Sequence, residues 1–187
     1  MKIKVLAAMT AALAASAGAE QKLDVFVNNG ERIPFETIQR AEALASRMFA
    51  GADVRIAWHG IACSGWKGRN HVIIIQLELD TPAAYHRGAL GYSLPYEGVH
   101  VSIFYNRIRQ MDQPNLEPVL LGHAMVHEMT HLLQGVNRHS ATGVMKAHWD
   151  SGDYLEMKRH ILALTPEDIQ MIRNAANHPA VIAAKIP

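Results

Sequence analysis

The sequence has few of the features that mark several large classes of protein. Cys63 is its one cysteine, so no internal disulfide can form, and a free, half-buried thiol is preferred to a metal or redox role. Lysine and arginine number 18 against 17 aspartate and glutamate, a balance that excludes an electrostatic footprint for nucleic acid. After the N-terminal segment no run approaches the roughly 18 apolar residues of a transmembrane helix, which argues against an integral membrane segment.

Residues 1–19 read "MKIKVLAAMTAALAASAGA", in which Lys2 and Lys4 precede an apolar run and a series of small residues. This layout predicts a secretory signal peptide, cleaved after Ala17 or Ala19, and a secreted or periplasmic protein. A retained anchor or a buried helix is the alternative. Residues 20–187 are then of a size for one compact domain, which we expect to be a monomer.

The pattern of apolar residues predicts an α+β fold: a small mixed twisted sheet with a backing helix, a long active-site helix and a helical C-terminal part. Strands are predicted at 22–30, 52–60, 71–80 and 99–108. Residues 87–98 are rich in glycine and proline and are expected to form an exposed edge. Helices are predicted from Pro34 to the residue before Gly51, from the Pro-rich stretch 110–118 to Gln134, over 151–164 and over 165–176.

Two histidines four residues apart, His127 and His131, lie in the predicted long helix with Glu128 between them. Positions four apart on an α-helix are offset by only about 40°, so both rings point to one side, within reach of one ion. Imidazole nitrogens suit Zn²⁺, and a catalytic zinc site has three protein ligands and leaves a fourth position to water. The motif therefore predicts a zinc site in which Glu128 takes a proton from the bound water.

The third zinc ligand stays open on the residues alone. Four side chains downstream of the motif are candidates: His139, His148, Asp150 and Glu156. His139 follows Gly135 closely enough for the chain to turn back under the helix, and we prefer it. Glu156, a carboxylate from a second helix, would instead complete a His₂Glu site. His123, one turn before His127, extends a row too straight to surround a tetrahedral ion, so we expect it behind the site or exposed.

These residues resemble the signature of the metzincin clan of zinc peptidases, His-Glu-x-x-His-x-x-Gly-x-x-His followed by a methionine-containing turn. The matching positions are His127, Glu128, His131, Gly135, His139 and Met145. "HSATGVM" at 139–145 is similar to the matrixin version, and "LTPEDIQMIR" at 164–173 resembles the closing helix of matrixins. The spacing departs from the clan, because the glycine and the third histidine lie four and eight residues after His131 rather than three and six.

The resemblance implies an exported zinc-dependent endopeptidase with Zn²⁺ held by His127, His131 and His139. It also implies a protein or peptide substrate bound in extended form along an edge strand, for which residues 89–95 are the natural candidate. Two alternatives stand beside this interpretation. One is a gluzincin-like peptidase with Glu156 as the third ligand, and the other is a non-catalytic, zinc-stabilised module that binds peptides without cutting them.

Overall fold

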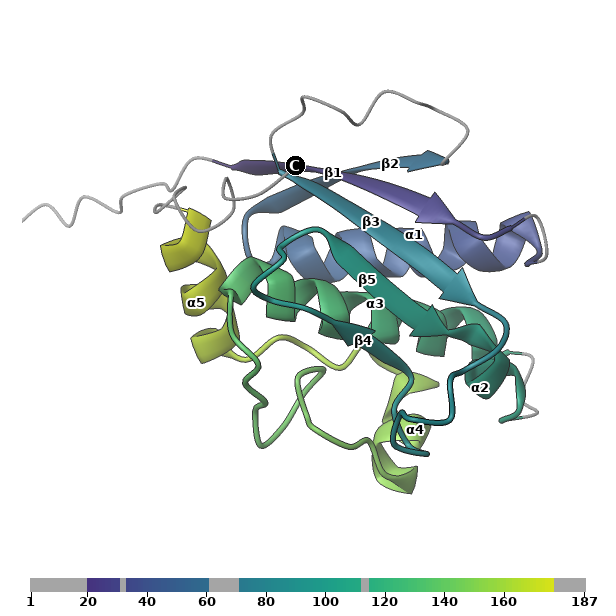
Figure 1. Ribbon diagram of the computed structural model, residues 1–187. Coiled ribbons are helices and arrows are strands. Elements are labelled where there is room, and N and C mark those ends of the chain that lie inside the picture. The colour runs from purple at the N-terminus through teal and green to yellow at the C-terminus, as the bar shows by residue number, and fades with distance from the viewer. Residues whose placement is uncertain (1–19, 31–32, 61–70, 112–114, 177–187) are drawn as a thin grey trace, which may run out of the picture.

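The structure is a computed structural model, and it describes residues 20–30, 33–60, 71–111 and 115–176 (Figure 1). The predicted signal peptide and Cys63 lie outside these residues, so the expectations for them stay predictions. Among the described residues, no helix combines the length and the apolar character that crossing a bilayer requires.

The helices and strands of the described residues follow one another in an α+β order. They are β1 (Gln21–Asn28), α1 (Phe35–Ala50), β2 (Val54–Gly60), β3 (Val72–Glu78), β4 (Gly91–Ser93), β5 (His100–Phe104), α2 (Tyr105–Arg109), α3 (Glu117–Gln134), α4 (Ser151–Met157) and α5 (Pro166–Ala176). The strands form one sheet in the order β2-β1-β3-β5-β4, in which β4 alone runs antiparallel to its neighbour. The predicted mixed α+β architecture is therefore confirmed.

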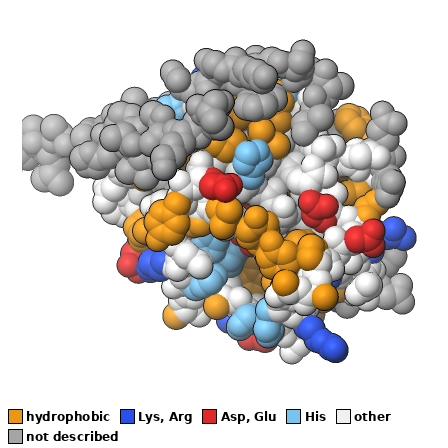
Figure 2. Space-filling model, viewed as in Figure 1, with side chains coloured by type: hydrophobic (Ala, Val, Ile, Leu, Met, Phe, Trp, Pro, Cys, Tyr) orange, Lys and Arg blue, Asp and Glu red, His pale blue; other side chains and the backbone are white. Residues whose placement is uncertain are grey.

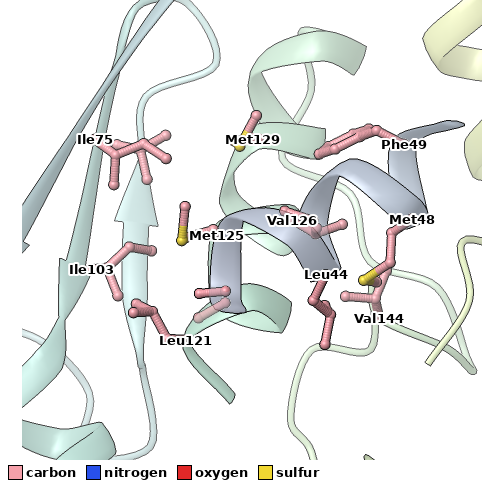
Figure 3. Packing of buried hydrophobic residues seen from close by; sticks show 14 of the residues in the cluster. Leu44, Met48, Phe49, Ile75, Ile103, Leu121, Met125, Val126, Met129 and Val144 are labelled. Carbon is pink, nitrogen blue, oxygen red and sulfur yellow. The ribbon is translucent and has the colours of Figure 1, made fainter. Parts of the chain in front are cut away.

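Helices α1 and α3 cover one face of this sheet (Figure 1). Apolar side chains alternate along β3, and Ile75 is fully buried toward the helices. Figure 3 shows Leu121 and Met125 of α3 pointing toward Ile75 and Ile103 of the sheet. Of the 18 residues of α3, all but three are buried, so this helix passes through the core rather than over the surface.

The close packing of α1 on α3 depends on Gly122. A Cβ atom at this position would lie 2.9 Å from the carbonyl oxygen of Ala41 and 3.0 Å from a methyl group of Leu44. The first distance, to a backbone atom, is shorter than real Cβ contacts, so a larger residue would push the helices apart. The register of α3 against α1, and with it the direction of the histidine row, is held by this contact.

Two predicted elements end well before the expected residue. The strand predicted over 99–108 stops at Phe104, because Tyr105 and Ile108 are both buried, three residues apart, in the helical turn α2. The helix predicted over 151–164 stops at Met157. Beyond this helix, a backbone amide forms a hydrogen bond with a residue far away in the chain. The Leu162 amide donates to Nε2 of His123 at 3.0 Å. Tertiary partners have replaced helical hydrogen bonds there.

Candidate zinc site

The structure brings together three histidines. His127 and His131 stand on α3 with ring centroids 4.9 Å apart, and the ring of His139 lies 5.3 Å from the first and 5.0 Å from the second. One ring nitrogen from each of the three lies within 4.8 Å of the others. In the described residues no other group of three or more histidine, cysteine, aspartate or glutamate side chains meets this criterion.

The chain reaches the third histidine by a sharp stop of α3 at the predicted position. Gly135 adopts a left-handed backbone conformation with φ 68°, which glycine tolerates without strain, and its amide donates to the carbonyl of His131. Further on, the Ser140 amide donates to the carbonyl of Met145 at 2.7 Å and closes a short turn. Val144 and Met145 are fully buried, which anchors the turn in the core.

The rings of His127 and His131 are oriented by backbone carbonyls. Nδ1 of His127 lies 2.8 Å from the carbonyl oxygen of Val144, and Nδ1 of His131 lies 3.2 Å from that of Val136. A carbonyl oxygen can only accept, so each Nδ1 carries the proton and each Nε2 presents a lone pair. Burial lowers the pKa of both histidines to about 4, so both rings are neutral at physiological pH.

This arrangement fits a zinc ion. The two Nε2 atoms lie 3.2 Å apart with lone pairs facing each other and no proton between them, a contact that a cation relieves. Neutral imidazoles whose second nitrogen donates to a carbonyl are the usual form of a zinc-ligating histidine. Three histidine ligands would leave a fourth position free, as a catalytic zinc site requires. The residues that would hold the ion are therefore His127, His131 and His139.

Glu128 stands beside the histidines and faces the edge strand β4. Its side chain is 8% exposed, and the hydroxyl of Ser93 in β4 donates to its Oε2 at 2.8 Å. Burial raises the pKa of Glu128 to about 7, and the Ser93 hydrogen bond acts against this rise. A carboxyl group with a pKa near neutrality can both accept and return a proton.

Gly91 of β4 makes this approach possible. A Cβ atom at this position would lie 2.9 Å from Cγ of Glu128 and 2.8 Å from the carbonyl oxygen of Ser102. Only a residue without a side chain fits between β5 and the carboxylate. The sequence places Gly91 inside the predicted edge segment, but its contact with Glu128 arises from the packing of β4 on α3.

A cleft of ≈390 Å³ opens above the histidines, and β4 forms one wall of it. Trp149 also lines the cleft; its ring stands edge-on to that of His127 at 5.8 Å, and its indole N–H donates to the Val144 carbonyl at 3.3 Å. Figure 2 shows histidine side chains gathered next to a band of hydrophobic ones on this face. The cleft therefore combines apolar walls with a polar floor.

The other candidate ligands lie elsewhere. His148 lines the cleft, with its ring 5.6 Å from that of His86, and it is not a member of the three-histidine group. Asp150 caps α4 and accepts from Lys146 at 2.7 Å. Glu156 is exposed and lines a separate hollow next to Thr165. These positions leave His139 as the one candidate that the fold brings to His127 and His131.

His123 lies behind the site and is fully buried, so the alternative of an exposed ring was wrong. Its Nδ1 donates to the Val119 carbonyl at 2.7 Å, and its Nε2 accepts from the Leu162 amide at 3.0 Å. Both ring nitrogens are thus used to join α3 to the segment after α4. Burial lowers the pKa of His123, in keeping with a neutral ring.

Sequence reasoning missed Ser93, Gly91 and Trp149. Ser93 and Gly91 carried a weak signal, because they lie in the segment predicted to be the edge next to the site. Trp149 carried none, since an isolated tryptophan in a loop is typical of many surfaces.

Comparison with known proteins supports the fold. No protein-family model matches the chain, and no curated protein does. Among solved structures, archaemetzincin from Methanopyrus kandleri is similar, with a TM-score of 0.56, 18% sequence identity, and coverage of 87% of this chain and 99% of that one. At this identity the likeness defines the fold, and the chain has an archaemetzincin-like α+β fold.

Proposed function

We propose that this chain is an exported zinc-dependent endopeptidase, with His127, His131 and His139 as zinc ligands and Glu128 as general base. The observation that carries the proposal is a buried glutamate next to three convergent histidines on the floor of an open cleft. The name of the structural neighbour, archaemetzincin, agrees with a metzincin-type zinc peptidase. The matrixin-like character of 139–145 and 164–173 belongs to the same proposal.

The chemistry divides between the metal and the side chains. Zinc, when bound, supplies a Lewis acid that polarises a carbonyl and lowers the pKa of water to about 7. Glu128 takes a proton from the attacking water and returns it to the leaving amine. Ser93 holds the carboxylate in place by its hydrogen bond to Oε2. The neutral rings of His127 and His131 keep their lone pairs directed at the site.

A protein or peptide substrate is proposed to bind in extended form along β4. This strand pairs with β5 along one edge, and within the described residues no strand pairs with its other edge. Gly91, Tyr92 and Ser93 all line the cleft. An unpaired strand edge offers backbone hydrogen bonds to a peptide, and the neighbouring apolar surface can take alternate side chains. A peptide bound there would lie next to Glu128, because Ser93 of the same strand donates a hydrogen bond to that carboxylate.

The test is zinc content together with hydrolysis of denatured protein by the purified protein. The parent should hold about one zinc per chain and should cleave. Glu128→Gln should keep the metal and lose activity by roughly 10²- to 10⁴-fold, because the general base is removed and the histidines are intact. Hydrolysis by Glu128→Gln at the parental rate would rule out the assigned base. A parent that binds zinc but cuts no substrate would favour the non-catalytic peptide-binding module.

A further inference from the structure

His139 differs from the other two histidines in how its ring is held. His127 and His131 each donate to a backbone carbonyl, whereas no hydrogen bond to the ring of His139 occurs among the described residues. Its loop also lacks regular structure between Gly135 and Ser140. A metal ligand without a partner for its second nitrogen depends on its backbone for orientation. Something else must therefore hold this stretch of chain.

One carboxylate oxygen holds the residues on both sides of His139. Nη1 of Arg138 donates to Oδ1 of Asp168 at 2.9 Å, and Oγ of Ser140 donates to the same oxygen at 2.8 Å. Arg138 also donates to the Ser140 hydroxyl at 3.2 Å and pairs with Glu167. The backbone of His139 is thus tied down immediately before and immediately after the ligand.

Asp168 is itself rigidly placed. It is 0% exposed, and its Oδ2 accepts from the Thr165 hydroxyl at 2.6 Å and from the Thr165 amide at 3.0 Å. The Asp168 amide donates back to the Thr165 hydroxyl, so the pair forms a capping box at the start of α5. The Asp168 carbonyl accepts from Gln134, the last residue of α3. The carboxylate is therefore fixed relative to the helix that carries His127 and His131.

We propose that Asp168 is a positioning residue that presents His139 to the metal. The inference rests on the proposed zinc site and adds to it a buried group outside the three-histidine cluster. Each carboxylate oxygen does a different job: Oδ2 locks the group into α5, and Oδ1 receives the two residues that flank the ligand. A full carboxylate is needed, because an asparagine has a single acceptor oxygen and cannot serve both sides.

The test compares Asp168→Asn with Ile172→Val for zinc affinity, by competition with a chromophoric chelator. Ile172 lies one turn further along α5 and is also buried, so its shortening weakens the packing of the helix without touching these hydrogen bonds. Asp168→Asn should weaken zinc binding by roughly 10- to 100-fold, the usual effect of losing a group behind a metal ligand. Ile172→Val should leave the affinity unchanged.

A second readout reports the geometry at the metal. In the cobalt-substituted protein, Asp168→Asn should alter the visible absorption bands, and Ile172→Val should not. Parental affinity and spectrum in a folded Asp168→Asn variant, or equal weakening in Ile172→Val, would overturn the inference. If Asp168→Asn does not fold, Ser140→Ala decides: weaker zinc binding supports the positioning role, and parental binding overturns it. A parent that binds no zinc would instead overturn the proposed function, and this inference with it.

Discussion

The two sides of the three-histidine site are held in different ways. His127 and His131 stand on α3, a helix buried along almost its whole length and packed against α1 through Gly122. His139 stands on a loop, and side-chain hydrogen bonds to Asp168 take the place of helical ones. One side is therefore set by helical periodicity and apolar burial, and the other by a few polar contacts between residues far apart in the chain.

The two sides are nevertheless not independent. The loop supplies the carbonyls of Val136 and Val144 that orient the two helix histidines. Val144 in turn is held by its amide, which donates to the Ala163 carbonyl at 3.1 Å. Next to it, Gly143 has φ 75°, and a Cβ atom there would lie 2.3 Å from the Ala163 oxygen, so only glycine fits. A substitution in the loop should therefore also change the orientation of the His127 and His131 rings on α3.

The largest effect should come from removing a ligand on either side. His131→Ala and His139→Ala should each weaken zinc binding by more than the roughly 10- to 100-fold typical of residues behind a ligand, because three donors become two. Chelator competition measures this. His148→Ala is the matched control, since His148 lines the same cleft outside the ligand group, and it should bind zinc like the parent. If His139→Ala bound zinc with parental affinity, His139 would not be a zinc ligand.

A smaller effect is expected from Ser93→Ala, which leaves both sides of the metal site in place. The variant loses the hydrogen bond that Ser93 donates to Oε2 of Glu128, and a bond to a charged group contributes about 1.5 kcal/mol or more. Turnover of a peptide substrate should fall by about tenfold, since ~1.4 kcal/mol corresponds to a factor of ten. Zinc content should stay at the parental level. A weakened zinc affinity would show that β4 supports the metal site itself.

The contact between His123 of α3 and Leu162, in the segment after α4, should make the stability of the protein depend on pH. Burial holds the pKa of His123 below its ordinary value of 6.5, so the unfolded state binds the proton more readily than the folded state. The contribution to stability is full above about pH 6.5 and is lost as the pH falls below it. His123→Gln keeps an acceptor for the Leu162 amide and does not titrate.

Thermal unfolding of zinc-loaded parent and His123→Gln between pH 7 and pH 5 measures this contribution. The melting temperature of the parent should fall more steeply with acid than that of the variant. Taking the difference removes the titration of the zinc ligands, which both proteins share. Equal slopes would contradict a neutral, structural His123.

The smallest effect should come from Glu156→Gln. Glu156 is exposed and lies outside the histidine group, so its variant should match the parent in zinc affinity and in turnover. If this variant released zinc while His139→Ala retained it, the third ligand would be Glu156, as in the gluzincin-like alternative, and not His139.

Much of the fold was accessible from local patterns. The alternation of Val25 and Val27 in β1, the stop at Gly135 and the start of α5 after Thr165 all depend on neighbours in the chain, and all three are where they were expected. The two shortened elements depend on distant partners. The end of β5 reflects burial of Tyr105, and the end of α4 precedes the bond between Leu162 and His123.

The amino-acid sequence by itself determined that His127 and His131 point the same way with Glu128 beside them, because spacing along one helix decides the direction of a side chain. It left four candidates for the third ligand, with His139 preferred: His139, His148, Asp150 and Glu156. Only the tertiary structure shows that His139 is the one that lies beside His127 and His131, since this proximity depends on where a loop turns in space. That turn is made by Gly135 and held by Asp168, and the hydrogen bonds between Asp168 and the residues beside His139 span 28 and 30 positions of the chain, a distance over which no local pattern carries information.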